Sequence, residues 1–567
     1  MLSETKLSLL QQLVQSATTE EIIWTKGYLA GYLDKNTVGV TVPNVLETPA
    51  IAVKPLIIYG TETGNSKKIA SQLLAGFKKN KIQAKAVDVF QYDLTKLEKE
   101  SLVLFVMSTQ GEGEFPQNAV AFYEKLKAAD VNLSKVSYAV FGLGDSSYPL
   151  YCNAGVLLDE VMLEKGANQL LTLVKADVDF AENVIDWEKN LLHVFHNNAP
   201  IQTGVSTEKK TEKTAHKKNY TGIISHKVIL NDRESNKETY HIEITSDEEI
   251  VYEPGDALGM IPKNTKEAVD FILNYFNANA SHEITLKEDK KTTEKWLEER
   301  NIKGLSKRSL DKIALLLQTT IDVEKADLID VLKQFVKPEK AHIESLIEIL
   351  LPIAPRLYSI SSSAEAHDGQ VHLTVNLNKF KTGDVLKTGL ASQYLADYAV
   401  GSKLDFYIHK NQNFRLPAED VNAIMIGPGT GIAPFRSFLA HRDATGAEGK
   451  NWLFFGEQHF VLDFYYQTEI QEWIGTGVLS KLDTAFSRDQ EQKIYVQDRI
   501  REKASEFNEW LESGASIYIC GQKNPMAQDV EQAIVEVIAQ ERKISLDEAR
   551  QVLEELDSQG KYQKDVY

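Results

Sequence analysis

Apolar residues recur along the chain in distinct patterns, and the changes of pattern divide it into blocks. Over residues 54–197 and again over about 420–567, short apolar runs alternate with segments of helical spacing. This alternation predicts βα units built around parallel sheets. The strand-like runs lie at 56–59, 102–107, 138–143, 423–426, 452–455, 480–486 and 517–519. We therefore expect two separate α/β domains.

The part between these blocks has a different character. β-rich segments at 220–230, 239–245, 357–380 and 402–409 surround a helical block at about 264–350. Two polar or Pro-rich stretches cannot form a core and are expected to be linkers, the second of them flexible. These linkers lie at 35–52 and 200–218, and two short amphipathic helices are expected over 3–34.

Length and composition limit the classes of protein that the chain can belong to. Its 567 residues are enough for about three to four domains, and 43% of them are hydrophobic. A net charge of −18 would repel a polyphosphate, so sequence-independent nucleic-acid binding is not expected, whereas a basic protein partner would suit it. Two distant cysteines exclude a disulfide scaffold, and no apolar run approaches 18 residues. A cytoplasmic protein is expected.

The first strand-like run is followed by a loop that suits a phosphate. The loop is short, rich in hydroxyl groups and opens a helix, whose free backbone N–H groups attract anions. It lacks the Gly-Lys-Ser/Thr ending of a nucleoside triphosphate site, so a phosphomonoester on a small cofactor fits better. Taken alone, the loop is equally compatible with an ordinary polar turn. Its residues are Thr61, Glu62, Thr63, Gly64, Asn65 and Ser66.

Two further polar loops follow strands of the same block. In an open parallel sheet the carboxyl ends of the strands share one edge, so three such loops are expected to form one site. Tyr148 can stack on a flat ring there or simply pack in the core. The residues concerned are Ser108, Thr109, Gln110 and Gly111 in one loop, and Leu143, Gly144, Asp145, Tyr148, Tyr151 and Cys152 in the other.

These three loops, in their order and content, resemble those of the flavodoxin family over residues 54–197. The resemblance implies bound FMN. It implies that Thr61–Ser66 surround the phosphate, whereas the other two loops surround the isoalloxazine ring.

The middle block carries two further anion-binding patterns. Arg356 and Tyr358 are two residues apart in a predicted strand and therefore face the same side, where a cation can meet a pyrophosphate and a phenol ring can lie against an aromatic cofactor. Downstream, a turn of small residues precedes a helix and forms a second cradle at Gly389, Leu390, Ala391 and Ser392. Each alone is also compatible with an ordinary strand or helix cap.

The last block has a glycine-rich turn that includes Gly429 and Thr430, after which a helix begins near Ile432. The glycines allow a close approach to a pyrophosphate. Ser487, Arg488 and Lys493 then place a hydroxyl and two cations after a strand, which favours the 2′-phosphate of NADPH, although a solvated loop would look the same. Tyr495 and Gln497 follow them; Cys520 ends a later strand, and Asp529 lies on the next helix.

The middle and last blocks together resemble the ferredoxin–NADP reductase family, and the whole order of blocks resembles the diflavin reductases. The resemblance implies a multidomain α/β protein: a flavodoxin-like doubly wound parallel sheet, an FAD-binding antiparallel β-barrel with a helical insertion, and an α/β NADP-binding domain. The implied divisions are 1–52 for the N-terminal helices and linker, 53–199 for the FMN domain, 200–218 for the linker, 219–415 for the barrel and 416–567 for the NADPH domain.

Within this family the chain resembles the flavoprotein (alpha) subunits of NADPH-dependent sulfite reductases. Gln110 stands where the microsomal cytochrome reductases have an aromatic, the chain ends in Tyr567 where they have Trp, and no N-terminal membrane anchor precedes the first block. Electrons are then expected to pass from NADPH to FAD, to FMN and to a haem protein, the sulfite reductase haemoprotein. A diflavin reductase for another haem or metal acceptor, such as a monooxygenase, and a non-catalytic flavin-binding protein are the alternatives. Homo-oligomerisation is compatible with the N-terminal helices.

The resemblance also implies roles for individual residues. Ser359, Cys520 and Asp565 are the implied catalytic residues of hydride transfer, together with Tyr567, which covers the flavin ring, although chain ends normally fray. FAD contacts are implied for Arg356, Leu357, Tyr358, Ser359, Thr374, Val375, Asn376, Phe380, Gly389, Leu390, Ala391, Ser392 and Tyr567. NADPH contacts are implied for Gly429, Thr430, Ser487, Arg488, Lys493, Ile494, Tyr495, Val496, Gln497 and Asp529. Two distant cysteines cannot hold sirohaem or an iron–sulfur cluster, and no metal is expected.

Overall fold

The computed structural model describes residues 54–61, 64–111, 113–146, 148, 150–177, 180–197, 218–286, 289–382 and 385–567, with the side chains of 196 and 197 left out. The predicted helices over 3–34, the predicted linker over 35–52, all but the last residue of the linker 200–218, and Glu62 and Thr63 lie outside these residues.

The first described domain is a doubly wound parallel sheet, as predicted. Its strands lie in the order β2-β1-β3-β4-β5, with β6 paired to β4, and every pair is parallel. The strands are β1 (Leu56–Gly60), β2 (Lys85–Asp88), β3 (Leu102–Ser108), β4 (Ser137–Leu143), β5 (Asn168–Gln169) and β6 (Val174–Ala176). The helices are α3 (Asn65–Lys79), α4 (Gln117–Ala128), α5 (Asn153–Glu164) and α6 (Ala181–Asn197), with the 3₁₀ turn η1 (Leu94–Lys99).

Both faces of this sheet are covered because its central strands are apolar at successive positions. On β3, Val103 and Phe105 pack with helices α4 and α5, whereas Leu104 and Val106 pack with α3 and α6. Two helix layers then enclose the sheet, which is the arrangement expected for a parallel sheet.

The middle domain is an antiparallel barrel. Its strands follow the order β14-β9-β18-β7-β8-β15, and a bridge between Ile360 and Leu373 joins the two ends. The strands are β7 (Asn219–Ile229), β8 (Thr239–Thr245), β9 (Ala257–Met260), β14 (Arg356–Ser359), β15 (Val371–Asn376) and β18 (Lys403–His409). A hairpin of β16 (Lys379–Thr382) and β17 (Val385–Thr388) leads into α12 (Leu390–Asp397).

The helical block between β9 and β14 has a hydrophobic core of its own. It contains α7 (Lys266–Phe276), α8 (Thr293–Glu299), α9 (Lys307–Leu316), α10 (Leu328–Leu332) and α11 (Ile343–Ile349). It also contains one short hairpin and a second pair of short strands that the periodicity did not predict, because strands of two to four mostly polar residues carry no alternating apolar pattern. The hairpin is β10 (Glu283–Leu286) with β11 (Asp289–Thr292). The second pair is β12 (Leu305–Ser306) with β13 (Lys325–Ala326), and α9 lies between these two strands in the sequence.

The last domain is a second parallel sheet, in the order β21-β20-β19-β22-β23. Its strands are β19 (Ala423–Ile426), β20 (Asn451–Glu457), β21 (Lys481–Phe486), β22 (Ser516–Gly521) and β23 (Tyr562–Val566). Its helices are α13 (Ile432–Thr445), α14 (Phe460–Asp463), α15 (Gln467–Thr476), α16 (Val496–Glu502), α17 (Ala504–Glu512), α18 (Gln528–Arg542) and α19 (Leu546–Ser558). The short turns η2 (Gly429–Gly431) and η3 (Lys523–Ala527) precede α13 and α18.

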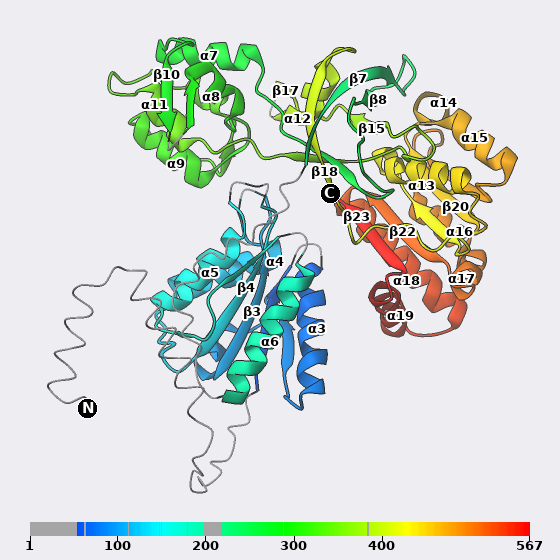
Figure 1. Ribbon diagram of the computed structural model, residues 1–567, viewed down its shortest axis with the longest axis horizontal. Helices are drawn as coiled ribbons and strands as arrows, with labels where there is room; N and C mark the ends of the chain where they lie inside the picture. Colours follow the sequence, from blue (N-terminus) through cyan, green and yellow to red (C-terminus); the bar gives the residue numbers. More distant parts are fainter. Residues whose placement is uncertain are drawn as a thin grey trace, which may run out of the picture.

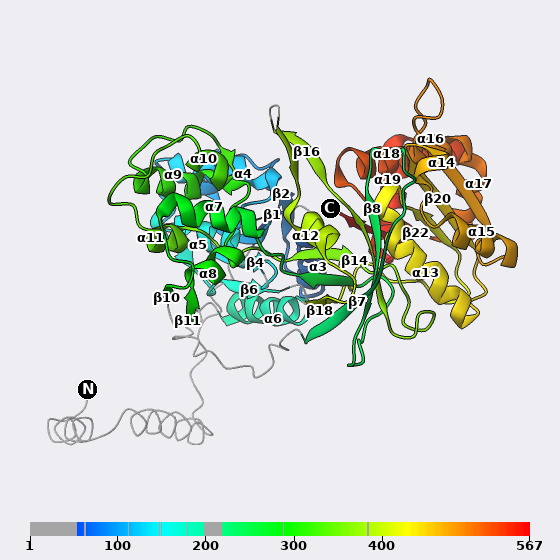
Figure 2. The same cartoon turned by 90° about the horizontal axis from the view of Figure 1, so that it is seen from above.

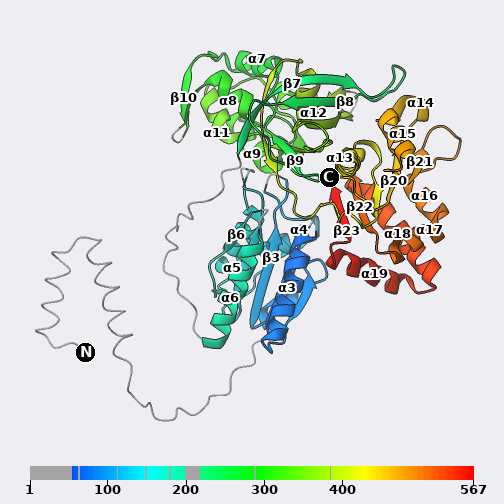
Figure 3. The ribbon, with the colours of Figure 1, turned by 45° about the vertical axis from the view of Figure 1, so that its right-hand side comes forward.

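The end of the chain is a strand, whereas chain ends normally fray. Residues 562–566 form β23, which pairs in parallel with β22 and places Asp565 opposite Cys520. The backbone N–H of Tyr567 donates to the Gly521 carbonyl at 3.1 Å, and its carbonyl accepts from the N–H of Lys523 at 3.0 Å. In Figure 1 this end lies where the three domains meet, and Figures 2 and 3 show the same position from two other directions. Within the described residues, none of the helices has the length and apolar character needed to cross a membrane.

Candidate functional site

A cavity of about 1710 Å³ lies where the three domains meet. Single-ligand pockets usually enclose about 300–1,000 Å³, so this one has room for more than one cofactor. The predicted site residues that line it are Gly64, Asn65, Ser108, Thr109, Leu143, Gly144, Asp145, Arg356, Leu357, Tyr358, Ser359, Thr374, Asn376, Phe380, Gly389, Leu390, Ala391, Ser392, Thr430, Asp565 and Tyr567.

The loop before α3 is built to receive an anion. The Thr61 hydroxyl oxygen accepts the N–H of Gly64 at 2.9 Å and that of Ser66 at 3.4 Å, which folds the loop back over the start of the helix. Gly64 has φ +89°, a conformation that favours glycine. Ser66 is fully buried in the first turn, and its hydroxyl has no hydrogen-bond partner in the described structure. A phosphate at this helix N-terminus would supply the missing acceptor.

The other two loops of the flavodoxin-like sheet end at the same edge, as the parallel topology predicted. The Ser108 hydroxyl donates to the Gly60 carbonyl at 3.3 Å, and the backbone N–H of Thr109 donates to the Leu143 carbonyl at 2.9 Å. The three strand ends are therefore joined directly. Gln110, Gly111, Tyr148 and Tyr151 belong to these loops but do not line the cavity.

Cys152 lies away from the cavity. Its thiol is fully buried and donates to the Gly142 carbonyl at 3.3 Å, so it faces the sheet. Burial raises the pKa of Cys152 to about 11, which keeps the thiol protonated at neutral pH. Its contribution to the loop is packing.

Three residues far apart in the sequence meet at one carboxylate that lines the cavity. The Ser359 hydroxyl on β14 donates to Asp565 Oδ2 on β23 at 2.7 Å, and the Cys520 thiol on β22 approaches the same oxygen at 3.9 Å. We call these three residues the Asp565 site. Burial raises the pKa of Asp565, and the Ser359 hydroxyl, His409 and Cys520 oppose this shift. Burial, followed by the charge of Asp565, raises the pKa of Cys520 well above its usual value.

Two tyrosines and an arginine surround the Asp565 site. Tyr358 lies half-buried next to Ser359, whereas the ring of Tyr567 is 64% exposed and its hydroxyl bonds Thr430 Oγ1 at 2.8 Å. The Arg356 guanidinium donates to the carbonyls of Ala354 and Pro355, which directs this exposed cation along the cavity wall. An anionic ligand here would meet a cation that no carboxylate of the described residues neutralises.

The remaining barrel residues have different roles. The Ser392 hydroxyl, in the first turn of α12, accepts the N–H of Asn378 at 3.1 Å and donates to the Gly389 carbonyl at 3.1 Å. Thr374 bonds the Tyr466 hydroxyl at 2.6 Å, while Val375, the next residue of the strand, packs inside the barrel core. Asn376 donates to Thr239 Oγ1 at 2.9 Å, and Phe380 is 44% exposed on the β16–β17 hairpin.

The glycine-rich turn after β19 requires its small residues. A Cβ on Gly431 would lie 2.2 Å from the Cys520 carbonyl oxygen, so only glycine lets α13 start this close to β22. Gly429 has φ +60°, again a conformation that favours glycine.

The predicted 2′-phosphate residues lie at the carboxyl edge of the same sheet but outside the cavity. The backbone N–H groups of Ser487 and Arg488 donate to the carbonyls of Glu457 and Gln458, both at 2.9 Å, which places this turn beside β20. The exposed residues of the set are Arg488, Lys493, Tyr495 and Asp529. Gln497 lies in the first turn of α16, whereas Ile494 and Val496 pack against the hydrophobic core and contribute no exposed side chain.

Sequence reasoning missed several cavity residues. Asn378, His409, Lys410, Asn411 and Asp177 line the cavity from loops or strand ends. The signal that could have found His409 is its position at the end of the predicted strand 402–409, because strand ends on this side of the barrel face the site.

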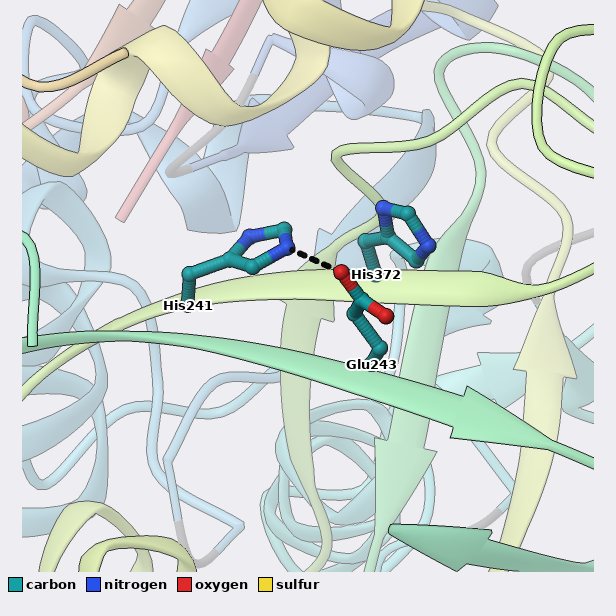
Figure 4. Close-up of side chains that lie close together, drawn as sticks. All are labelled: His241, Glu243 and His372. Atoms are coloured by element: carbon teal, nitrogen blue, oxygen red, sulfur yellow. Dashed lines mark hydrogen bonds and ion pairs between the residues drawn. The ribbon is translucent and has the colours of Figure 1, made fainter. Parts of the chain in front are cut away.

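A separate cluster joins the barrel to the last domain. Among the residues that the structure describes, His241, Glu243 and His372 form the one group with ligand atoms close enough to hold a metal ion (Figure 4). However, His241 bonds the Tyr466 hydroxyl and Glu243, both at 3.1 Å. Arg436 on α13 places its guanidinium 3.1 Å from His372 Nδ1. A fixed cation beside the ring opposes a second cation, so the geometry favours a hydrogen-bond network.

The network is centred on the buried Arg436. Its guanidinium forms two bonds with Glu469, at 2.6 and 2.7 Å, and donates to the Ser361 carbonyl of the barrel at 2.8 Å. Burial first, and Arg436 second, lower the pKa of His241 to about 4 and that of His372 to about 2. Both imidazoles are therefore neutral in the folded protein at neutral pH.

Comparison with known proteins agrees with this architecture. The flavodoxin family model matches residues 57–186, the FAD binding domain model matches 212–316 and 297–394, and the oxidoreductase NAD-binding domain model matches 425–532. A flavodoxin-like sheet, an FAD-binding barrel and a nucleotide-binding sheet around one cavity define a diflavin reductase.

Individual relatives narrow this class. The sulfite reductase (NADPH) flavoprotein alpha-component of Bacillus subtilis (strain 168) is 34% identical, and the alignment covers all of this chain and 98% of that protein. The proteins of the same name from Buchnera aphidicola and Vibrio cholerae are each 36% identical, with all of this chain and 98% and 96% of those proteins covered. The chain belongs to the family of sulfite reductase flavoprotein alpha-components.

The network around Arg436 predicts acid sensitivity of the joined domains. Because the pKa of His241 is lower in the folded chain than the ordinary 6.5, stability is complete above pH 6.5 and is lost as the pH falls towards 4. Each such histidine should lower the free energy of unfolding by about 1.4 kcal/mol per pH unit in this window. Thermal unfolding measured between pH 7.5 and 5 should show a steep fall, and His241→Gln should make it shallower.

His441→Gln is the matched control, because His441 pairs with Glu365 at 3.0 Å in a more exposed position. It should keep the wild-type slope. An unchanged slope in His241→Gln would contradict the assignment of this acid sensitivity to the buried network.

Proposed function

We propose that this chain passes electrons from NADPH to FAD, from FAD to FMN, and from FMN to the haemoprotein of a sulfite reductase, which reduces sulfite to sulfide. The observation that supports it most is the position of the Asp565 site in one cavity with the flavodoxin-like loops. Flavins supply the chemistry that joins a two-electron donor to a one-electron acceptor. The acceptor assignment follows the names of the relatives.

The flavodoxin-like domain, taken as residues 53–199, is assigned to FMN. The start of α3, with Ser66, holds the phosphate, and the loops after β3 and β4 surround the ring. The barrel, taken as 219–415, is assigned to FAD. Arg356 and the start of α12 at Ser392 would hold its phosphates, and Tyr358 and Tyr567 would contact its ring. Residues 416–567 hold NADPH, with Ser487, Arg488, Lys493 and Asp529 as its polar contacts.

The Asp565 site does the positioning and charge stabilisation during reduction of FAD. Asp565, as an anion, stabilises the positive charge that develops on the nicotinamide. Ser359 fixes its carboxylate through the 2.7 Å hydrogen bond and presents its oxygen beside the flavin. The protonated Cys520 thiol is small enough to leave room for the nicotinamide. Tyr567 must move aside to admit that ring, and its exposed side chain is free of core packing.

The acidic surface suits docking to the proposed haemoprotein partner. The chain is also proposed to act in the cytoplasm. Its net charge of −18 favours a haemoprotein with a basic docking face. Association into a homo-oligomer is part of the same proposal.

Flavin content and acceptor preference test the proposed function together. Acid extraction of the purified protein should release FMN and FAD in equal amounts, and NADPH should bleach both. The reduced protein should then reduce a sulfite reductase haemoprotein faster than cytochrome c or a monooxygenase haem. A single flavin, or no preference for the sulfite reductase haemoprotein, would contradict the proposal.

Asp565→Asn should slow NADPH-dependent flavin reduction by about 10²-fold, because a neutral amide cannot stabilise the nicotinamide cation. Since burial raises the pKa of Asp565, the wild-type rate should decline on the acid side at a higher pH than an ordinary carboxyl gives. Stopped-flow absorbance across pH 5–8 measures both effects. Asp405→Asn, at an exposed carboxylate that accepts from Thr221, is the control and should leave the profile unchanged.

Ser66→Ala should weaken FMN binding by about tenfold or more, the value of a lost hydrogen bond to a charged group. The physical reason is that the Ser66 hydroxyl is buried at the start of α3 with no partner of its own. Titration of FMN into deflavinated protein, followed by fluorescence quenching, measures this. Ser71→Ala, on the exposed face of the same helix, should bind FMN like the wild type.

A further inference from the structure

His409 lies between the flavodoxin-like domain and the Asp565 site. It is the last residue of β18, and its Nδ1 is 4.0 Å from Asp145 Oδ2 in the loop after β4. Each of the two side chains is only 14% exposed. His409, Asp145 and Asp565 all line the cavity.

A second ion pair joins the flavodoxin-like domain to the last domain and is more exposed. Lys67 on α3 contacts Glu554 on α19 at 3.2 Å, but these side chains are 55% and 67% exposed. Exposed pairs contribute about 0–1 kcal/mol and are screened by salt, whereas a sheltered pair is screened much less. Among the described residues, the contact between Asp145 and His409 therefore has a larger effect on docking of the flavodoxin-like domain than the contact between Lys67 and Glu554.

Three aspartates line the cavity together with His409. The flavodoxin-like domain presents Asp145 and Asp177, and β23 presents Asp565. Lys410, the next residue, is 3.0 Å from Asp256, a carboxylate that it shares with Arg415. The other charged groups along the cavity are Arg356, Lys325, Lys523, Glu531, Arg550 and Lys564.

We infer that His409 is the residue through which the FAD-binding barrel holds the flavodoxin-like domain, because its imidazolium attracts Asp145 on one side and Asp565 on the other. The positive charge of His409 also lowers the pKa of Asp565, which burial raises. Histidine changes charge between pH 5 and 8, so docking weakens as the pH rises through this range. The inference rests on the proposed electron relay and adds a positioning residue to it.

Three variants separate charge from packing. His409→Gln removes the charge, and the ratio of docked to extended molecules should fall by about fivefold, which corresponds to 1 kcal/mol. His409→Lys keeps a cation at all pH values of interest, so it should stay docked at pH 8, where the wild type opens. His441→Gln should behave like the wild type. Small-angle X-ray scattering of the full-length oxidised protein at pH 6 and 8 measures this ratio without turnover.

Electron transfer gives the second readout. After mixing with NADPH, the rate of FMN reduction divided by the rate of FAD reduction should be about fivefold lower in His409→Gln than in the wild type. This ratio reports docking separately from the effect of the lost charge on Asp565. If His409→Gln gives the same scattering as the wild type at pH 6, the inference is overturned. Equal opening of His409→Gln and His409→Lys would overturn it too, because the contact would then depend on shape and not on charge.

These outcomes are distinguishable from failure of the proposed function. If NADPH reduces no flavin in the wild type or in His441→Gln, the relay is refuted. The scattering series still decides whether His409 holds the two domains together.

Discussion

The whole site depends on the parallel pairing of β22 with β23. This pairing puts Asp565 opposite Cys520, and the Ser359 hydroxyl from the barrel completes the contact at 2.7 Å. A buried carboxylate is costly unless hydrogen bonds satisfy it, so the barrel and the last domain must keep a fixed relative position. The network around Arg436 supplies this rigidity, since it ties α13 to both β15 and the Ser361 carbonyl.

The sequence predicts the α/β domains well because their central strands are apolar at successive positions. A run such as 102–107 can only be a strand covered on both faces, and the structure has β3 there. The last strand escaped prediction for the opposite reason. β23 reads Tyr-Gln-Lys-Asp-Val, and only its pairing with β22 makes it a strand. Pairing between distant segments is not encoded in local periodicity.

Local sequence patterns also fail to predict the directions of several side chains in the candidate site. Parallel topology predicts that the loops after β1, β3 and β4 meet, because strand ends share an edge. It does not predict that Cys152 faces the sheet, that Val375 faces the barrel core, or that Val496, at the start of α16, packs in the core of the last domain. Those directions depend on tertiary packing. The proximity of Asp145 to His409 is likewise a property of domain placement, 264 positions apart in the sequence, and no local motif could indicate it.

The strength of the contacts between domains matters because the flavodoxin-like domain must both receive electrons from the FAD-binding barrel and deliver them to the acceptor. A docked state favoured by many kcal/mol would keep the flavodoxin-like domain away from its acceptor, whereas a docked state without any contact would be rarely populated. An exposed pair at Lys67 and Glu554 and a sheltered pair 4.0 Å apart at Asp145 and His409 give a shallow preference. A preference of about 1 kcal/mol is a fivefold population ratio, small enough for either state to be reached within a catalytic cycle. Weak ionic contacts are therefore what this geometry requires between the flavodoxin-like domain and the other two domains, in contrast to the rigid, buried network that joins the barrel to the last domain.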